Sequence, residues 1–350
     1  MHGWSARGRS RTGQKNMTAK NIKILGAGIT GLWQALTLAR AGHKVMLVEK
    51  SRVPFSEASS RFAGAMLAPY CEAETAEPII KELGIQALPL WRETFPDLKT
   101  HGTLVLAQPR DQGELRQYAR QTEGHKTLDV GELASIEPDL AERYQSALFF
   151  PDEAHLAPRQ TMRQLLTLIK EAGGTILLDK DELQPGSDED FIIDCTGINA
   201  RKNLKDLRGV RGEMAIIKSD EIKLSRPVRL LHPRFPLYVV PWEDDQYMLG
   251  ATLIEREDDG PVTLRSALDL LAMAYALHPG FGEAEIMEFG AGLRPAFPDN
   301  TPRIVLADRH IYINGLFRHG FLLAPILAEH TRRYIETGEP TSELMIGLSD

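Results

Sequence analysis

Short apolar runs and one helix-like stretch alternate in the N-terminal part of the chain. Residues 21–25 are mostly apolar, and residues 29–41 repeat apolar side chains at the spacing of one helix face before Gly42 ends the pattern. Residues 45–48 then form a continuous apolar run, which is typical of a strand buried on both faces. The pattern predicts a β-α-β unit with two parallel strands and a right-handed crossover.

A similar pattern returns in the middle and near the end of the chain. Residues 161–172 predict a helix that stops at a pair of glycines, and residues 175–178 predict another buried strand. Short apolar strands are also expected at residues 191–194 and 311–313, each followed by a turn that contains glycine. We expect all of these strands to share one parallel sheet.

A second group of strand-like runs has no helical stretches between its members, which favours a mixed or antiparallel sheet. These runs are residues 103–107, 147–150, 214–217, 237–240 and 247–249. The fold class is therefore α/β (α+β), with a Rossmann-like nucleotide-binding domain on a parallel central sheet and a substrate domain on a mixed or antiparallel β-sheet.

The two predicted domains interleave along the chain. The nucleotide-binding domain is expected to comprise residues 21–85, 155–210 and 285–350. The substrate domain is expected to comprise residues 86–154 and 211–284, inserted between those pieces. Each strand-helix pattern falls in the first set and most strand-only runs fall in the second.

Composition narrows the class of partner. The chain has 350 residues, 25% charged and 43% hydrophobic, with a formal net charge of −7 at pH 7. No run of Lys or Arg interrupts its body, so we expect a small-molecule partner and no nucleic acid. The two cysteines, Cys71 and Cys195, lack metal-binding spacing, which favours reduced cytoplasmic thiols and no metal. Residues 321–328 are too short an apolar stretch to span a membrane.

The first 20 residues differ from the rest because they contain five basic residues and no acidic ones. Two interpretations stay open: an organelle-targeting leader, or a disordered extension translated from a start upstream of Met17. The segment lacks an amphipathic stripe and an apolar core, which favours the disordered extension for residues 1–20.

A glycine-rich turn joins the first predicted strand to the first predicted helix. Its residues are Gly26, Ala27, Gly28, Ile29, Thr30 and Gly31, in the order G-x-G-x-x-G. In such a turn Gly26 permits the tight bend, Gly28 lets a pyrophosphate approach the backbone, and Gly31 lets the helix pack on the strand. Glu49, at the end of the second strand, is placed to accept from ribose hydroxyls and disfavours NADP; Lys50 beside it is a further candidate.

The fingerprint alone leaves FAD and NAD open, and four further segments decide between them. They are residues 59–69, residues 194–197, residues 292–295 with 298–299, and residues 318–325. Through them the chain resembles the D-amino-acid oxidase family over nearly all of residues 21–336, and within that family it is most similar to the glycine oxidases of thiamine biosynthesis. The resemblance implies a non-covalent FAD, hydride transfer from a small amino acid or amine to the flavin, O₂ as electron acceptor, and a homotetramer.

The resemblance also assigns residues to the cofactor. These are Ala63, Gly64, Ala65, Met66, Thr196, Gly197, His319, Gly320, Phe321 and Leu322. Small side chains at residues 63–65 are expected to let the backbone lie flat against the flavin ring. Gly320 is expected to direct a second helix N-terminus at the pyrimidine end of that ring, which favours negative charge there. Arg61 stands where some relatives carry a histidine that bonds the flavin, so the attachment should be non-covalent.

Three residues are implied to hold the substrate. Arg294 falls on the family's carboxylate-binding arginine, and a guanidinium matches a carboxylate bidentately. Tyr238 falls on a tyrosine that assists the same carboxylate, and Arg318 on a second active-site arginine. Glycine oxidases usually carry Asn at the position of His319 and a smaller residue at that of Phe297, which leaves the substrate less certain than the reaction.

Other residues affect these hypotheses less directly. Leu253 and the segment around Phe62 are positions that could change the pocket volume, and His155, His232 and His319 are interpreted as surface or packing residues. The leading hypothesis is oxidation of glycine to the imine that supplies the thiazole of thiamine. The alternatives are a broader D-amino-acid or sarcosine oxidase, a quinone-linked dehydrogenase, or a flavin-binding redox sensor without turnover.

Overall fold

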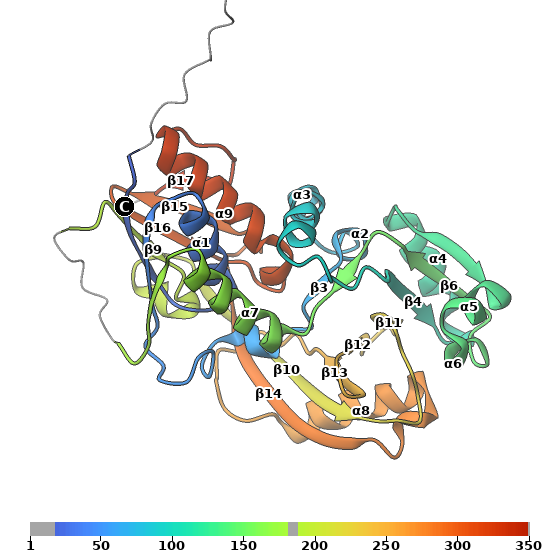
Figure 1. Ribbon diagram of the computed structural model, residues 1–350. Coiled ribbons are helices and arrows are strands. Elements are labelled where there is room, and N and C mark those ends of the chain that lie inside the picture. Colours follow the sequence, from blue (N-terminus) through green and yellow to red (C-terminus); the bar gives the residue numbers. More distant parts are fainter. Residues whose placement is uncertain (1–17, 181–187, 349–350) are drawn as a thin grey trace, which may run out of the picture.

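The computed structural model describes residues 18–180 and 188–348, and the predicted N-terminal extension lies almost wholly outside them. Two large sheets, one of seven strands and one of eight, lie side by side (Figure 1). A third, small sheet has two strands. The α/β (α+β) prediction is confirmed.

The seven-stranded sheet contains every strand that was expected in the parallel sheet. Its order is β17 (Met345–Gly347), β15 (Arg303–Ala307), β16 (His310–Asn314), β9 (Phe191–Asp194), β1 (Asn21–Leu25), β2 (Lys44–Val48) and β8 (Thr175–Leu177). All neighbours are parallel except β15 and β16, which form an antiparallel pair. The sheet is therefore mixed at one edge, a feature that the apolar pattern did not predict.

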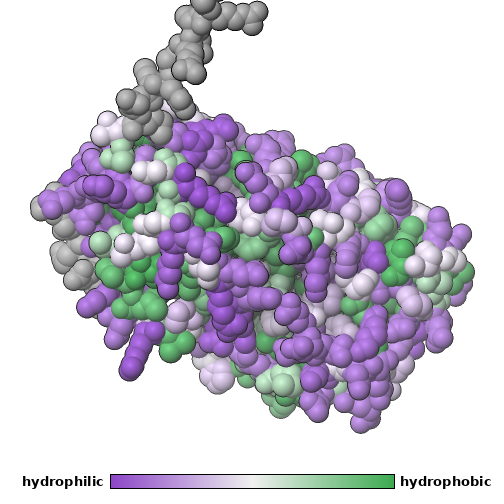
Figure 2. Space-filling view, viewed as in Figure 1, coloured by the Kyte–Doolittle hydropathy of each residue, from purple (hydrophilic) through white to green (hydrophobic). Residues whose placement is uncertain are grey.

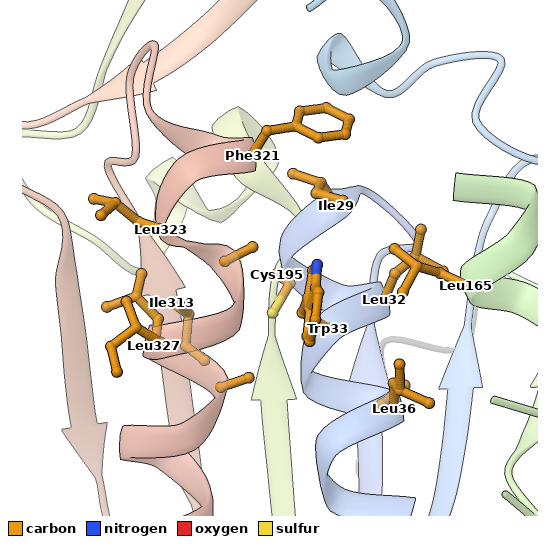
Figure 3. Close-up of a cluster of buried hydrophobic side chains, with 14 of the residues drawn as sticks. Ile29, Leu32, Trp33, Leu36, Leu165, Cys195, Ile313, Phe321, Leu323 and Leu327 are labelled. Atoms are coloured by element: carbon orange, nitrogen blue, oxygen red, sulfur yellow. The ribbon is translucent and has the colours of Figure 1, made fainter. Parts of the chain in front are cut away.

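Four helices pack on this sheet or on one another beside it. They are α1 (Ile29–Arg40), α3 (Pro78–Thr94), α7 (Pro158–Glu171) and α9 (Gly320–Thr337). Figure 3 shows α1 and α9 with their apolar side chains, Trp33 among them, between the two helices and over the strands. Trp33 meets Trp91 edge to face at 4.8 Å between ring centroids, and the Trp91 indole donates to the Phe321 carbonyl at 2.9 Å. These contacts fix α1, α3 and α9 together.

The eight-stranded sheet contains all five runs expected in the substrate domain. Its order is β14 (Glu285–Ala296), β10 (Arg208–Lys218), β13 (Gln246–Gly250), β12 (Leu237–Pro241), β11 (Val228–Leu231), β4 (Thr103–Ala107), β6 (Ser146–Phe150) and β5 (Lys126–Asp129). Only β11 and β4 pair in parallel, so this sheet is mixed. Residues 285–296, expected in the nucleotide-binding domain, pair here with β10 because β10 and β14 form one long antiparallel ladder. The other domain boundaries remain predictions.

Shorter elements complete the described part of the chain. The helices are α2 (Pro69–Glu72), α4 (Gln112–Gln121), α5 (Val130–Ile136), α6 (Pro138–Ala141) and α8 (Leu264–Leu277). The 3₁₀ turns are η1 (Ser59–Phe62), η2 (Pro109–Asp111), η3 (Gly197–Lys202) and η4 (Pro279–Phe281). The small sheet pairs β3 (Met66–Leu67) with β7 (Ala154–His155).

The surface is mostly hydrophilic on the face seen in Figure 2, with apolar residues in small separate groups. Within residues 18–180 and 188–348, no helix combines the length and the apolar character needed to cross a membrane. A mostly hydrophilic face is ordinary for a chain whose apolar side chains are largely buried in core clusters.

The glycine-rich turn is the tightest junction in the seven-stranded sheet. Gly26 has φ of +91°, a left-handed conformation that strains any residue with a side chain. A Cβ at Gly31 would lie 1.9 Å from the Gly26 carbonyl oxygen, so the first turn of α1 rests directly on the backbone that leaves β1. The packing role expected for Gly31 is what the geometry requires.

Replacing Gly31 with Ala should therefore lower the free energy of unfolding by about 1–3 kcal/mol or more, because the new methyl group overlaps a backbone atom. The matched control is Gly113→Ala in α4, where no heavy atom lies within 4 Å of the added Cβ. The control should be neutral or more stable, by up to about 1 kcal/mol. Denaturant titration measures both, and equal stabilities for the two variants would contradict this account.

Candidate active site

One cavity lies where the two large sheets approach each other. It is bounded by the start of α1, the segment before β3, the start of α9 and strands of the second sheet. The predicted site residues that line it are Gly28, Ile29, Thr30, Ala63, Gly64, Ala65, Met66, Gly197, Tyr238, Arg294, Arg318, His319, Gly320, Phe321 and Leu322. Segments far apart in the sequence are thus brought to a single site.

The remaining predicted residues do not line the cavity. They are Gly26, Ala27, Gly31, Glu49, Lys50 and Thr196. The Glu49 carboxylate is buried, and it accepts from the backbone N–H groups of Ala27 at 2.8 Å and Ser51 at 2.9 Å. Through the bond from Ala27, the Glu49 carboxylate holds the glycine-rich turn in place. The Lys50 ammonium lies 2.6 Å from the Glu57 carboxylate at the surface.

Thr196 shapes the turn that follows β9. Its hydroxyl donates to the Asp194 carboxylate at 2.6 Å, and its backbone N–H donates to the same oxygen at 2.9 Å. The next residue, Gly197, accepts from the Asn314 side chain at 2.8 Å and reaches the cavity. Thr196 therefore positions Gly197, and only the latter faces the site.

Two helix N-termini meet at the cavity. A Cβ on Gly320, the first residue of α9, would lie 3.4 Å from the Ile29 side chain, the first residue of α1. No side chain caps α9, so the first N–H groups of that helix remain without an intrahelical partner. Both ends carry partial positive charge, which makes this part of the cavity suited to anionic groups.

Ser60 is a wall residue that sequence reasoning did not assign. Its hydroxyl oxygen accepts from the Ile29 backbone N–H at 3.2 Å, and a Cβ on Gly28 would meet no heavy atom nearer than this oxygen at 3.5 Å. The space over Gly28 is therefore free for a ligand, as a pyrophosphate contact requires. Its place inside the family-like segment 59–69 was the only available signal.

The role expected of residues 63–65 remains a prediction, and Gly64 has a packing role in the protein besides it. A Cβ on Gly64 would lie 3.1 Å from the Tyr238 ring and 3.3 Å from the Val240 side chain. The glycine is thus demanded by protein packing on its own side of the wall. Ala65 has φ of +52°, an uncommon conformation that directs the chain into β3.

Arg294 extends from β14 across the neighbouring strand. A Cβ on Gly212 of β10 would lie 2.1 Å from the Arg294 guanidinium nitrogen Nη2, so glycine is needed for the side chain to cross. Nη1 donates to the Thr252 carbonyl at 3.1 Å. Burial lowers the pKa of Arg294, and no carboxylate lies within 4.0 Å of its guanidinium in the part of the chain that the structure describes. This cation has unused donors at the cavity.

Arg318 also lines the cavity, but a carboxylate pairs with two of its three guanidinium nitrogens. Its Nη2 donates to Glu72 Oε1 at 3.0 Å, and its Nε lies 3.0 Å from Glu72 Oε2. Glu72 raises the pKa of Arg318 more than burial lowers it. Burial alone would raise the pKa of Glu72, yet Arg318, His319 and Arg229 together lower it. Glu72 was missed from the sequence because its partner is 246 residues away.

Tyr238 and His319 complete the polar wall. The Tyr238 ring lies on Gly250 of β13, where a Cβ would be 2.5 Å from Cε2. Tyr238 acts to raise the pKa of both Arg294 and Arg318. Burial lowers the pKa of His319 to about 4, although Glu72 opposes the change, so this imidazole is neutral near pH 7. The interpretation of His319 as a packing residue agrees with its 5% exposure.

Positions considered as volume determinants divide in two. Phe62 lines the cavity, whereas Phe297 is buried against Gly315 outside it, where a Cβ would be 2.2 Å from its ring. Leu253 is 51% exposed and away from the wall. Arg61 pairs with Glu288 at 3.2 Å. Phe297 and Leu253 therefore do not shape this cavity directly.

The other two histidines, His155 and His232, do not line the cavity. His155 is buried, where burial lowers its pKa to about 3, and His232 accepts from the backbone N–H groups of Arg234 and Phe235 at the surface. Outside the undescribed segments, no group of three His, Cys, Asp or Glu side chains is arranged to hold a metal ion.

Behind Glu72, a fully buried carboxyl supports α2. Glu153 Oε1 accepts from the Cys71 backbone N–H at 2.7 Å. Burial raises the pKa of Glu153 to about 8, while the Cys71 N–H and the Thr103 hydroxyl partly oppose the increase. The neutral acid is thus the favoured form of this side chain through most of the physiological range.

This carboxyl makes stability depend on pH in a definite direction. In the unfolded chain its pKa is about 4.3, so between about pH 4.3 and 8 the folded chain binds more protons and stability falls as the pH rises. Glu153→Gln should reduce the loss of Tm between pH 5 and pH 8, with exposed Glu114→Gln in α4 as the control. The assignment is wrong if both variants follow the parent's pH profile.

Known proteins share much of this sequence. The family model described as FAD dependent oxidoreductase matches residues 21–333. The chain is 48% identical over 322 residues to a Rhizobium etli protein named "Putative thiamine biosynthesis oxidoreductase ThiO", covering 91% of this chain and 98% of that one. It is 25% identical over 361 residues to a glycine oxidase of Bacillus licheniformis, covering 93% and 92% of the two chains.

A solved structure shows the same fold. The crystal structure of glycine oxidase from Bacillus cereus ATCC 14579 superposes with a TM-score of 0.78 at 22% identity, covering 93% of this chain and 99% of that one. The cavity between the two sheets therefore lies in a fold that this chain shares with a glycine oxidase.

Proposed function

We propose that this chain, which belongs to the FAD dependent oxidoreductase (DAO) family, binds FAD and oxidises glycine or another small amino acid. The observation that carries the proposal is Arg294, a buried guanidinium with unused donors in the same cavity as two helix N-termini. A fixed planar cation suits a substrate carboxylate, and the helix termini suit an anionic cofactor.

The residues present fit FAD in three respects. Space over Gly28 is open, Glu49 holds the turn that ends there, and α9 offers free N–H groups where negative charge would develop on reduction. The proposed cofactor-binding residues are Gly26, Ala27, Gly28, Ile29, Thr30, Gly31, Glu49, Lys50, Ala63, Gly64, Ala65, Met66, Thr196, Gly197, His319, Gly320, Phe321 and Leu322. When bound, FAD supplies the acceptor for a hydride from the substrate's α-carbon.

The protein's own part is to bind and orient the substrate. Arg294 is proposed to hold the carboxylate bidentately while the Tyr238 hydroxyl assists, which fixes the α-carbon relative to the cofactor. The amine must be neutral before a hydride leaves. His319 stays neutral because its pKa lies at about 4, so it adds no charge to repel or trap that amine.

The reaction has a defined balance. The α-carbon loses a hydride and the nitrogen a proton, giving an imine, and O₂ accepts the electrons and becomes hydrogen peroxide. For glycine the imine is dehydroglycine, which hydrolyses to glyoxylate and ammonia. Relatives named for thiamine biosynthesis support the proposal that here the imine supplies the thiazole of thiamine. A homo-oligomer remains part of the proposal, from family resemblance alone.

Arg294→Ala should lower kcat/KM for glycine by at least roughly tenfold to a hundredfold, because a bidentate bond to a charged group is lost. Lys should rescue only partly, since a point charge does not reproduce the planar fork. A peroxide assay on glycine, sarcosine, D-alanine and a carboxylate-free amine measures the effect. Exposed Arg116→Ala in α4 is the control and should match the parent.

Two checks give this experiment its meaning. The FAD content of each variant is measured first, so that loss of cofactor is not taken for loss of substrate binding. Oxidation of glycine by Arg294→Ala at the parent's rate would mean that the carboxylate binds elsewhere.

The FAD should leave the protein intact on acid precipitation, because the segment before β3 offers Arg61 where a bonding histidine would stand. In this structure Arg61 is also engaged with Glu288 and with the Ser56 carbonyl. The supernatant should contain all of the yellow chromophore and the pellet none. Flavin that stays with the denatured chain would disprove non-covalent binding.

A further inference from the structure

The charges at the cavity form an unusual set. The charged side chains that line it are Arg294, Arg318 and Glu72, with neutral His319 beside them. Glu72 cancels Arg318 through two contacts of 3.0 Å, so the wall carries one net positive charge, and that charge belongs to Arg294. A small amino acid with a neutral amine carries one negative charge, which matches the wall.

Glu72 is held firmly enough to do this. It is the last residue of α2, its side chain is 15% exposed, and its backbone N–H donates to the Ala68 carbonyl at 3.0 Å. His319 Nδ1 lies 3.8 Å from its Oε2. Arg229, the next cation behind it, is paired with a different carboxylate, Glu74, at 2.8 Å. Glu72 is therefore available to Arg318 alone among these arginines as a close partner.

We propose that Glu72 determines specificity for the charge of the substrate: by occupying Arg318 it leaves a single free guanidinium, so that the cavity accepts one carboxylate and rejects dianions. This inference rests on the proposed function, because it takes Arg294 as the group that binds the substrate carboxylate. Without the Glu72 charge, Arg318 would be a buried cation with free donors, and a second carboxylate would be its natural partner. With Glu72 in place, that second carboxylate meets a like charge and a guanidinium whose Nε and Nη2 are already paired with Glu72.

The test compares Glu72→Gln with the parent, since glutamine keeps the shape and removes the charge. The matched control is Glu74→Gln, because Glu74 pairs with Arg229 and does not line the cavity. FAD content and Tm are measured first on each FAD-loaded protein. Binding of acetate and of malonate is then titrated through the change in flavin absorbance, and kcat/KM is measured for glycine and for iminodiacetate.

The parent and Glu74→Gln should bind acetate more tightly than malonate. In Glu72→Gln the ratio of malonate to acetate affinity should rise by at least about tenfold, since a new charge-assisted pair becomes available. The ratio of kcat/KM for iminodiacetate over glycine should rise in the same direction. An unchanged malonate-to-acetate ratio in Glu72→Gln would overturn the proposal and leave Glu72 a structural residue only.

A second pair of variants tests the same idea if Glu72→Gln does not fold. Arg318→Gln leaves the Glu72 charge uncancelled, so it should weaken binding of both anions, by about tenfold or more. The double variant Glu72→Gln with Arg318→Gln removes both charges and should regain the parent's acetate affinity and its preference for acetate. Failure of the double variant to recover acetate binding relative to Arg318→Gln would overturn the proposal.

The outcomes also separate this inference from the proposed function. If the parent binds acetate but oxidises no small amino acid, the proposed function fails while the two anion titrations still decide the role of Glu72. If the parent oxidises glycine and the anion ratios do not move in Glu72→Gln, only the inference fails.

Discussion

The close approach of two backbones at the start of α1 is the constraint on which the site depends. Because Gly31 has no Cβ, the helix rests against the Gly26 carbonyl, and its N-terminus is fixed at the end of β1. Figure 3 shows Ile29 of α1 near Phe321 of α9, and a Cβ on Gly320 would lie 3.4 Å from the Ile29 side chain, so the two helix starts lie together. A shift of α1 by the width of a methyl group would move its positive helix end relative to the cavity.

The groups that determine the charge of the cavity come from both halves of the structure. The helix ends lie beside the seven-stranded sheet, whereas the eight-stranded sheet carries Arg294 on β14 and Tyr238 on β12, with β10 and β13 between these two strands. Arg294 remains free because the strands beside it offer glycine and a carbonyl rather than a carboxylate. Arg318 lies on the turn before α9 and is satisfied by Glu72 from α2. Buried arginines of the same cavity therefore differ in chemistry only through what each one touches.

Local patterns in the sequence were enough to predict five strands of the seven-stranded sheet, five strands of the eight-stranded sheet and the helix after the glycine-rich turn, because apolar periodicity and glycine punctuation act over a few residues. They did not predict the antiparallel edge at β15, the place of β14, or the Glu72–Arg318 pair, since each depends on partners far away in the chain. The contact of Gly64 with Tyr238 was not predicted for the same reason, because Tyr238 lies far away in the chain, on a strand of the eight-stranded sheet.

The long ladder between β10 and β14 separates two duties of the molecule. Arg294 and its supporting Gly212 belong to that ladder, whereas the glycine-rich turn and the start of α9 belong to the other sheet. Substitution of Arg294 therefore changes the group proposed to hold a substrate carboxylate and leaves the glycine-rich turn of the other sheet in place. By this division, substrate range can change through residues of one sheet while the glycine-rich turn of the other sheet is kept.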